Sequence, residues 1–169
     1  MGDAEPSFVC PQCGTTHAGL PKDYGYKLPD EVWAIPHDER KSAAKFTSDL
    51  CQFGDRYFIR CLLKTPFVGS DDYFGWGLWV ETARSVFERY VALYDQDASA
   101  EPLYAGTIAN RPTLYADALG ADVLIQFGPS KDRPVIYFPA GARSALAVEQ
   151  REGLDLARYH AVLEAIGAI

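Results

Sequence analysis

Two cysteines near the start of the chain carry the clearest chemistry in the sequence. Cys10 and Cys13 are separated by two residues, and Gly14 follows directly. This spacing lets two thiolates point to one side of a tight turn, and glycine tolerates the left-handed backbone that lets nearby amides donate to the sulfurs. The spacing therefore predicts a metal-binding turn within residues 8–20, with zinc as the metal.

A zinc site normally has four ligands, so the remaining thiols are candidates for the third. If Gly54 and Asp55 form a two-residue hairpin loop, Cys51 lies opposite Phe58 and Cys61 points to the other, apolar face. A three-residue loop would reverse this assignment. With the two-residue loop, Cys61 is a small buried hydrophobe. Cys51, which lies in a more polar segment, is then the better ligand.

Histidine is the natural fourth ligand. His17 follows Cys13 by four residues, so a turn of the chain could bring its imidazole to the metal. His37 is the alternative, whereas His160 lies on an apolar helical stripe that is more typical of a core histidine. The predicted ligand set is Cys10, Cys13, His17 and Cys51.

The same cysteines allow two other interpretations, thiol redox chemistry and structural thiols without metal. A thioredoxin-like pair opens a helix, and the residues from Gly14 to Thr16 are a poor helix start. The sequence contains no nucleophile elbow, Walker loop or His-Glu-x-x-His pattern. A catalytic role is therefore left open and is not favoured.

Composition and charge limit the classes of protein to which the chain could belong. The chain has 169 residues, a net charge of −7 and 48% hydrophobic residues, which is typical of one globular domain. Its acidity disfavours nucleic acid and permits a basic protein partner. No apolar run reaches the length of a membrane span, and the acidic N-terminus is unlike a secretory signal. We therefore expect a cytoplasmic protein with reduced thiols.

Periodicity and turn residues predict the order of elements. We expect a loose tail over 1–7 and a hairpin over 45–67. Further strands are expected near 73–81, 102–109, 121–127 and 135–138. A helix capped by Ser85 should follow the first of these strands, and the C-terminal stretch from 142 should be helical. The expected fold is one α+β domain over 1–169, with an antiparallel sheet, two or three helices and a zinc-knuckle-like turn docked on it.

Several segments together resemble the bacterial domain-of-unknown-function family numbered 2199. The resemblance covers nearly the whole chain and is carried by residues 8–21, 48–51, 57–60, 74–80, 133–134 and 149–153. The chain departs from the family pattern at Arg143–Ala147, where the family has a histidine-containing segment, and at Cys61, where a glycine is expected. The resemblance directs attention to the same four predicted ligands and implies no reaction.

The sequence thus predicts a small interaction or regulatory protein with a structural zinc. The alternatives are a metal-dependent enzyme with an open zinc position and a thiol redox protein. If the zinc is structural, contacts with a partner should lie elsewhere. The acidic loop at Asp71 and Asp72, beside an aromatic strand, is the candidate surface for a basic partner.

Overall fold

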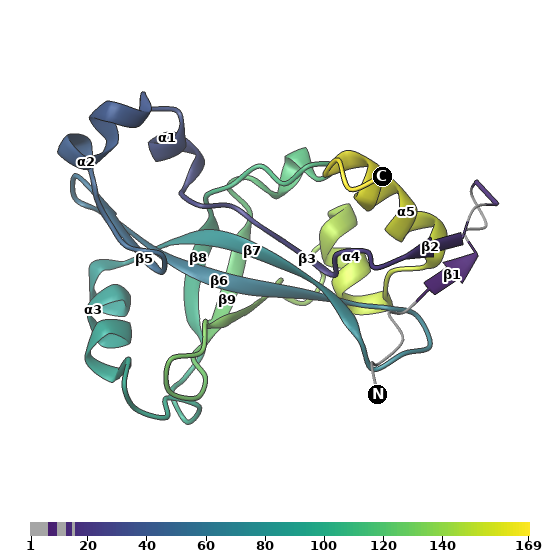
Figure 1. Cartoon of the computed structure of the whole chain (residues 1–169). Coiled ribbons are helices and arrows are strands. Elements are labelled where there is room, and N and C mark those ends of the chain that lie inside the picture. The colour runs from purple at the N-terminus through teal and green to yellow at the C-terminus, as the bar shows by residue number, and fades with distance from the viewer. Residues whose placement is uncertain (1–6, 10–12, 15) are drawn as a thin grey trace, which may run out of the picture.

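A long antiparallel hairpin organises the fold. Its strands, β6 (Arg56–Pro66) and β7 (Tyr73–Thr82), pair continuously from Tyr57 opposite Thr82 to Pro66 opposite Tyr73. The computed structural model describes residues 7–9, 13–14 and 16–169, and Figure 1 shows this hairpin running across the whole molecule. Both strands are rich in aromatic and branched residues, which favour the extended backbone.

Five strands close into a barrel around one face of this hairpin. From β7 the ring continues through β8 (Tyr104–Ile108), β9 (Asp122–Gln126) and β10 (Val135–Tyr137), each antiparallel to its neighbour. The ring closes because β10 lies parallel to β6, with Val135 opposite Leu62. The Leu62 amide also donates to the Pro134 carbonyl over 2.8 Å.

The remaining strands extend the ring. β5 (Leu50–Phe53) and β4 (Lys45–Phe46) continue antiparallel from β6, and β3 (Asp23–Gly25) runs parallel along β7. A separate two-stranded hairpin contains β1 (Ser7–Val9) and β2 (Thr16–Ala18). Figure 1 shows that hairpin at the end of the molecule opposite to β5.

Helices cover the ends of the barrel and the outer face of the hairpin. Near β5 lie α1 (Asp30–Trp33), the 3-10 turn η1 (His37–Glu39) and α2 (Arg40–Ala43). α3 (Arg84–Leu93) follows β7, and the short η2 (Ala116–Ala118) precedes β9. The C-terminal helices, α4 (Ala145–Glu152) and α5 (Leu156–Ala165), lie together near β1 and β2 (Figure 1).

Strand alternation divides the apolar side chains into two cores. One face of the hairpin, including Ile59, Leu63 and Trp76, fills the barrel with side chains from α3, α4 and α5. The opposite face presents Phe58 and Trp79 to a second, smaller cluster outside the barrel. Since successive strand residues point to opposite faces, one hairpin supplies both clusters.

The expected α+β fold with a simple antiparallel sheet is wrong, because the strands close into a five-stranded barrel. The reason is the parallel pairing of β10 with β6, a contact between distant segments that no local pattern specifies. The strands expected near 73–81, 102–109, 121–127 and 135–138 are confirmed as β7 to β10.

The local predictions in the hairpin and helices have mixed outcomes. The two-residue loop is confirmed, since Phe53 pairs with Arg56 and Cys51 lies opposite Phe58. The predicted cap of α3 is wrong, because Ala83 occupies the N-cap without a side-chain bond. Glu88 instead accepts a hydrogen bond from Arg84 over 2.8 Å, so the capping box does not form.

A substitution at Gly106 tests how tightly the barrel wall is packed. A Cβ atom at this residue would lie 2.5 Å from Cγ1 of Val80 and 2.9 Å from Cδ1 of Ile125. We expect Gly106→Ala to lower the free energy of unfolding by about 1–3 kcal/mol, because neighbouring side chains must move. Gly128→Ala, where a Cβ meets no atom within 4 Å, is the control. Chemical denaturation giving equal stabilities for the two variants would contradict this packing.

Candidate functional site

An arm of the chain, residues 26–44, lies over the outer face of the β6–β7 hairpin. Leu28 and Val32 of the arm pack with Cys51, Phe58 and Trp79 in the second apolar cluster. These side chains are buried, and burial of apolar surface is the main force that holds such a segment down. The arm is therefore a packed part of the domain.

Asn110 anchors the start of the arm. Its side chain is fully buried, its Oδ1 accepts the Trp79 amide over 2.7 Å, and its Nδ2 donates to the Leu28 carbonyl and to Asp30, both at 2.9 Å. Asp30 also accepts the Arg111 amide over 2.7 Å. One amide side chain thus joins β7, the arm and α1.

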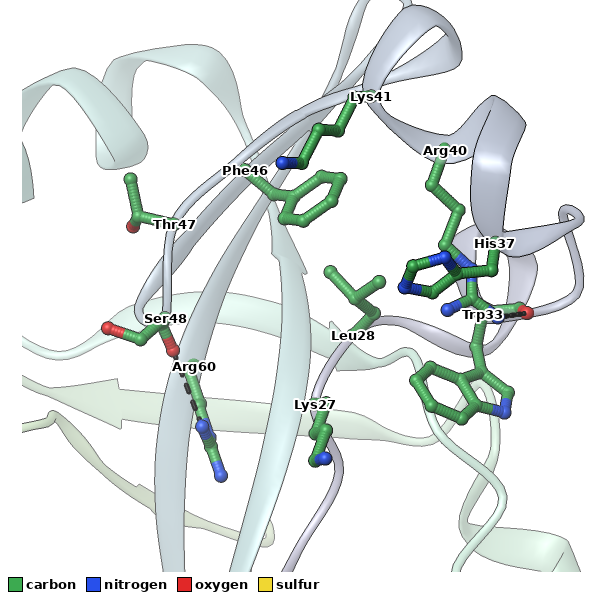
Figure 2. A pocket seen from close by; sticks show the side chains of 10 residues that line it. All are labelled: Lys27, Leu28, Trp33, His37, Arg40, Lys41, Phe46, Thr47, Ser48 and Arg60. Atoms are coloured by element: carbon green, nitrogen blue, oxygen red, sulfur yellow. Dashed lines mark hydrogen bonds between the residues drawn. The ribbon is translucent and has the colours of Figure 1, made fainter.

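A cavity of about 570 Å³ opens between the arm, the β4–β5 segment and β6, and its lining is strongly basic (Figure 2). Its cationic side chains are Lys27, Arg40, Lys41 and Arg60, and the imidazole of His37 also lines it. None of the described lining residues is acidic. The chain as a whole carries a net charge of −7, so this basic pocket is a local reversal of charge.

The same pocket has apolar and hydroxyl-bearing walls. Leu28, Trp33 and Phe46 supply the apolar surface, and Thr47 and Ser48 supply hydroxyl groups. Figure 2 shows Leu28 near the centre of the pocket, with the other labelled side chains around it. Sites for small organic molecules commonly combine a mainly apolar surface with a few polar groups.

Arg60 is the most constrained cation of the pocket. A Cβ on Gly25 would lie 2.6 Å from its Nη2, and one on Gly77 would lie 3.6 Å from it. The two glycines of the paired β3 and β7 strands therefore leave the space that the guanidinium occupies. A glycine within a strand often marks such a close approach.

The guanidinium of Arg60 is incompletely paired. Its Nε is buried without a hydrogen-bond partner, while Nη1 donates to the Ser48 carbonyl at 3.4 Å. Burial lowers its pKa and the charge of Arg133 lowers it further, whereas Asp49 opposes both effects. Asp49 itself accepts a hydrogen bond from Arg133 over 3.0 Å. An anion in the pocket would compensate the Arg60 charge.

Arg40 and Trp33 are held together at the pocket wall. The Arg40 guanidinium lies 4.2 Å from the centroid of the Trp33 ring. It also donates to the carbonyls of Ile35, over 2.9 Å, and Trp33, over 2.7 Å. Cation–π contact and two backbone bonds fix both side chains, so this part of the wall is organised before any ligand arrives.

The structure describes only part of the predicted zinc site. Cys10 and the side chain of His17 lie outside the described part of the chain, and Cys13 is exposed. Cys51 lies in the apolar cluster beneath the arm, and Figure 1 shows its strand at the opposite end of the molecule from β1 and β2. Within the described residues, no three His, Cys, Asp or Glu side chains group as metal ligands.

Burial determines the protonation state of the Cys51 and Cys61 thiols. It raises the pKa of the Cys51 thiol to about 11 and raises that of Cys61 further above its usual value. Both thiols are therefore protonated at neutral pH. Cys61 lies in the barrel core, as predicted, and the apolar surroundings of Cys51 differ from the polar site that its sequence neighbours suggested.

The other residues considered from the sequence have structural partners. His160 is buried in α5, consistent with a core histidine, whereas His37 is exposed at the pocket. In the acidic loop, Asp72 pairs with Lys22, which lowers the Asp72 pKa. Trp76 and Trp79 are both buried in the two cores, so the tryptophans of the aromatic strand are core residues.

The segment at 149–153 also has a structural role. The carboxylate of Glu149 accepts hydrogen bonds from Tyr115 and Arg158. Gln150 spans β10 by accepting the Phe138 amide and donating to the Ile136 carbonyl, both at 2.9 Å. These bonds fix α4 against the barrel, so the segment stabilises the fold and does not form the pocket.

Sequence reasoning missed the basic pocket because its cations share no motif. They come from the arm and from β6, and only the folding of the arm onto the hairpin brings them together. The available signal is Arg60 itself, an arginine that alternation places on the same face of its strand as Phe58. A charged residue beside a buried aromatic one indicates a partner or a site.

A family model described as an uncharacterised protein conserved in bacteria, DUF2199, matches residues 9–154, and the chain belongs to this family. The match confirms the resemblance noted in the sequence. No curated protein and no solved structure matches the chain. Across the described residues, no helix is both long and apolar enough to cross a membrane.

Asn110 provides a direct test of how the arm is anchored. We expect Asn110→Ala to lower the free energy of unfolding by about 2 kcal/mol, because the Trp79 amide and the Leu28 carbonyl lose a buried partner. Gln52→Ala is the matched control, since its amide makes one exposed hydrogen bond of 3.3 Å. Urea denaturation in which both variants match the wild type would show that Asn110 does not hold the arm.

Proposed function

We propose that this protein binds a small organic anion in the basic pocket and acts as a cytoplasmic binding or regulatory protein. The observation that carries the proposal is the convergence of Lys27, Arg40, Lys41 and Arg60 on one cavity. Like charges repel, so a cluster of cations without acidic partners in the described lining is costly unless an anion compensates it.

The size and walls of the pocket support a small molecule as the ligand. Its volume of about 570 Å³ lies within the range typical of such sites. Arg40 and Arg60 are half-buried, whereas Lys27 and Lys41 are exposed, so the two arginines attract an anion more strongly than fully solvated side chains do. Trp33 and Phe46 would contact the apolar part of the same molecule, which favours an organic anion over a simple inorganic one.

A binding role is favoured over catalysis by the types of side chain present. Lysine and arginine bind and orient anions but stay protonated at neutral pH. Of the described lining residues, His37 is the one with an imidazole; it is exposed, and its Nδ1 lies 3.4 Å from Oδ1 of Asp38. An enzyme remains the alternative function, and ligand turnover would favour it.

Ligand-induced thermal stabilisation tests the anion site. We expect some members of a panel of phosphorylated and carboxylated metabolites to raise the melting temperature, because a ligand that binds only the folded state stabilises it. Arg60→Gln and Lys41→Gln should each weaken the apparent affinity by about tenfold, the equivalent of one lost charged hydrogen bond. Added salt should weaken binding as well.

Arg143→Gln is the matched control for this experiment, because it removes an exposed arginine that does not line the pocket. It should leave the stabilisation unchanged. The proposal fails if no anion stabilises the wild type, or if the control loses as much stabilisation as the pocket variants.

We also propose a structural zinc in the N-terminal turn. Val9 pairs with Thr16, and Gly14 has a φ of 71°. This frame supports the expected geometry of a Cys-x-x-Cys turn. Because Cys51 lies under the arm, we take Cys10, Cys13 and His17 as the ligands to test first.

Zinc content measured by elemental analysis tests this second proposal. Purified wild-type protein should hold about one zinc per chain, and Cys13→Ser should lose it. Cys51→Ala should retain the metal, since Cys51 packs in the apolar cluster beneath the arm. Absence of zinc from the wild type would end the proposal, and loss of zinc from Cys51→Ala would place that thiol among the ligands.

A further inference from the structure

A second cavity adjoins the basic pocket. It has a volume of about 390 Å³ and shares Lys27, Leu28 and Trp33 with the first cavity. Tyr24 and Tyr26 complete its aromatic wall. Because three residues line both cavities, one elongated molecule could occupy the two together, with its middle beside Trp33 and Lys27.

The two cavities differ in charge. The basic pocket has four Lys and Arg side chains, whereas the second cavity has Lys27 and Asp30, whose charges cancel. Asp30 is held in place by hydrogen bonds from Asn110 and from the Arg111 amide. The anionic end of a ligand therefore belongs in the basic pocket, and an uncharged part belongs in the second cavity.

The second cavity also has exposed aromatic rings. Trp33 is 52% exposed and Tyr24 is 37% exposed, although Trp76 and Trp79 are both buried. Tyr24 packs edge-on against Tyr26, with ring centroids 5.5 Å apart, and Arg40 holds the indole of Trp33. Such pre-positioned ring faces suit stacking with a planar group.

We infer that the ligand is a phosphate monoester that carries a planar aromatic ring, with its phosphate in the basic pocket and its ring against Tyr24 and Trp33. This inference rests on the proposed anion site. A phosphate monoester is a dianion near neutral pH, so it compensates a cluster of four cations better than a single carboxylate does. The net charge of −7 disfavours a nucleic-acid strand, which would extend beyond the basic pocket.

Calorimetry with three related probes tests the inference on the full chain. Adenosine 5′-monophosphate has both the ring and the phosphate, ribose 5-phosphate lacks the ring, and adenosine lacks the phosphate. We expect the nucleotide to bind at least about tenfold more tightly than either of the others, since each group would contribute separately.

Two sets of variants separate these contributions. Tyr24→Leu should weaken binding of the nucleotide by about tenfold and leave ribose 5-phosphate unchanged, because it removes only a ring contact. Trp33→Leu should weaken the nucleotide more than ribose 5-phosphate, because it removes a ring contact and also the cation–π partner of Arg40. Arg60→Gln should weaken both phosphates alike. Arg143→Gln is again the control, and far-UV circular dichroism should show that every variant is folded.

The outcomes distinguish this inference from the proposal on which it rests. If the two phosphates bind equally well, or if Trp33→Leu and Tyr24→Leu keep the wild-type preference, the ring site is refuted and the anion site stands. If neither phosphate binds but other anions still stabilise the protein through Arg60, only the aromatic phosphate is excluded. If no anion binds through Arg60, both proposals fail.

Discussion

The continuous pairing of β6 with β7 is the constraint on which the structure depends. Its alternation sends Ile59 and Leu63 into the barrel and sends Phe58 and Arg60 to the outer face. A shift of one residue in this register would exchange the two sets. It would bury the Arg60 charge in the barrel and expose the barrel core to water, so the same register secures the fold and creates the outer surface on which the pocket forms.

The arm completes the pocket because two sets of contacts hold it in place. Apolar contacts of Leu28 and Val32 attach it to the outer face, and Asn110 fixes its start through backbone and side-chain bonds. Pre-organisation of this kind lowers the entropy lost when a ligand binds. Arg60 faces a cavity built by the arm, so its partly desolvated charge is tied to the presence of that segment.

The spacing of Cys10 and Cys13 in the sequence directs attention first to the cysteine turn, and the structure adds a second region to consider. The two are spatially distinct, since β1 and β2 lie at one end of the molecule and the arm lies at the other (Figure 1). The proposed zinc turn and the proposed anion pocket therefore lie in separate regions of the molecule. Loss of zinc need not abolish binding, and the variants proposed above examine each region by itself.

The sequence by itself determined the local elements, namely the turn near Gly54 and Asp55 and the strands from β7 to β10. It predicted the burial of Cys61 only on the alternative of a two-residue loop. These follow from alternation and turn chemistry, which act over a few residues. Only the tertiary structure decided the closure of the barrel, the apolar surroundings of Cys51 and the basic pocket. Each depends on contacts between distant segments, where the energy of packing, rather than any local spacing, selects the partners.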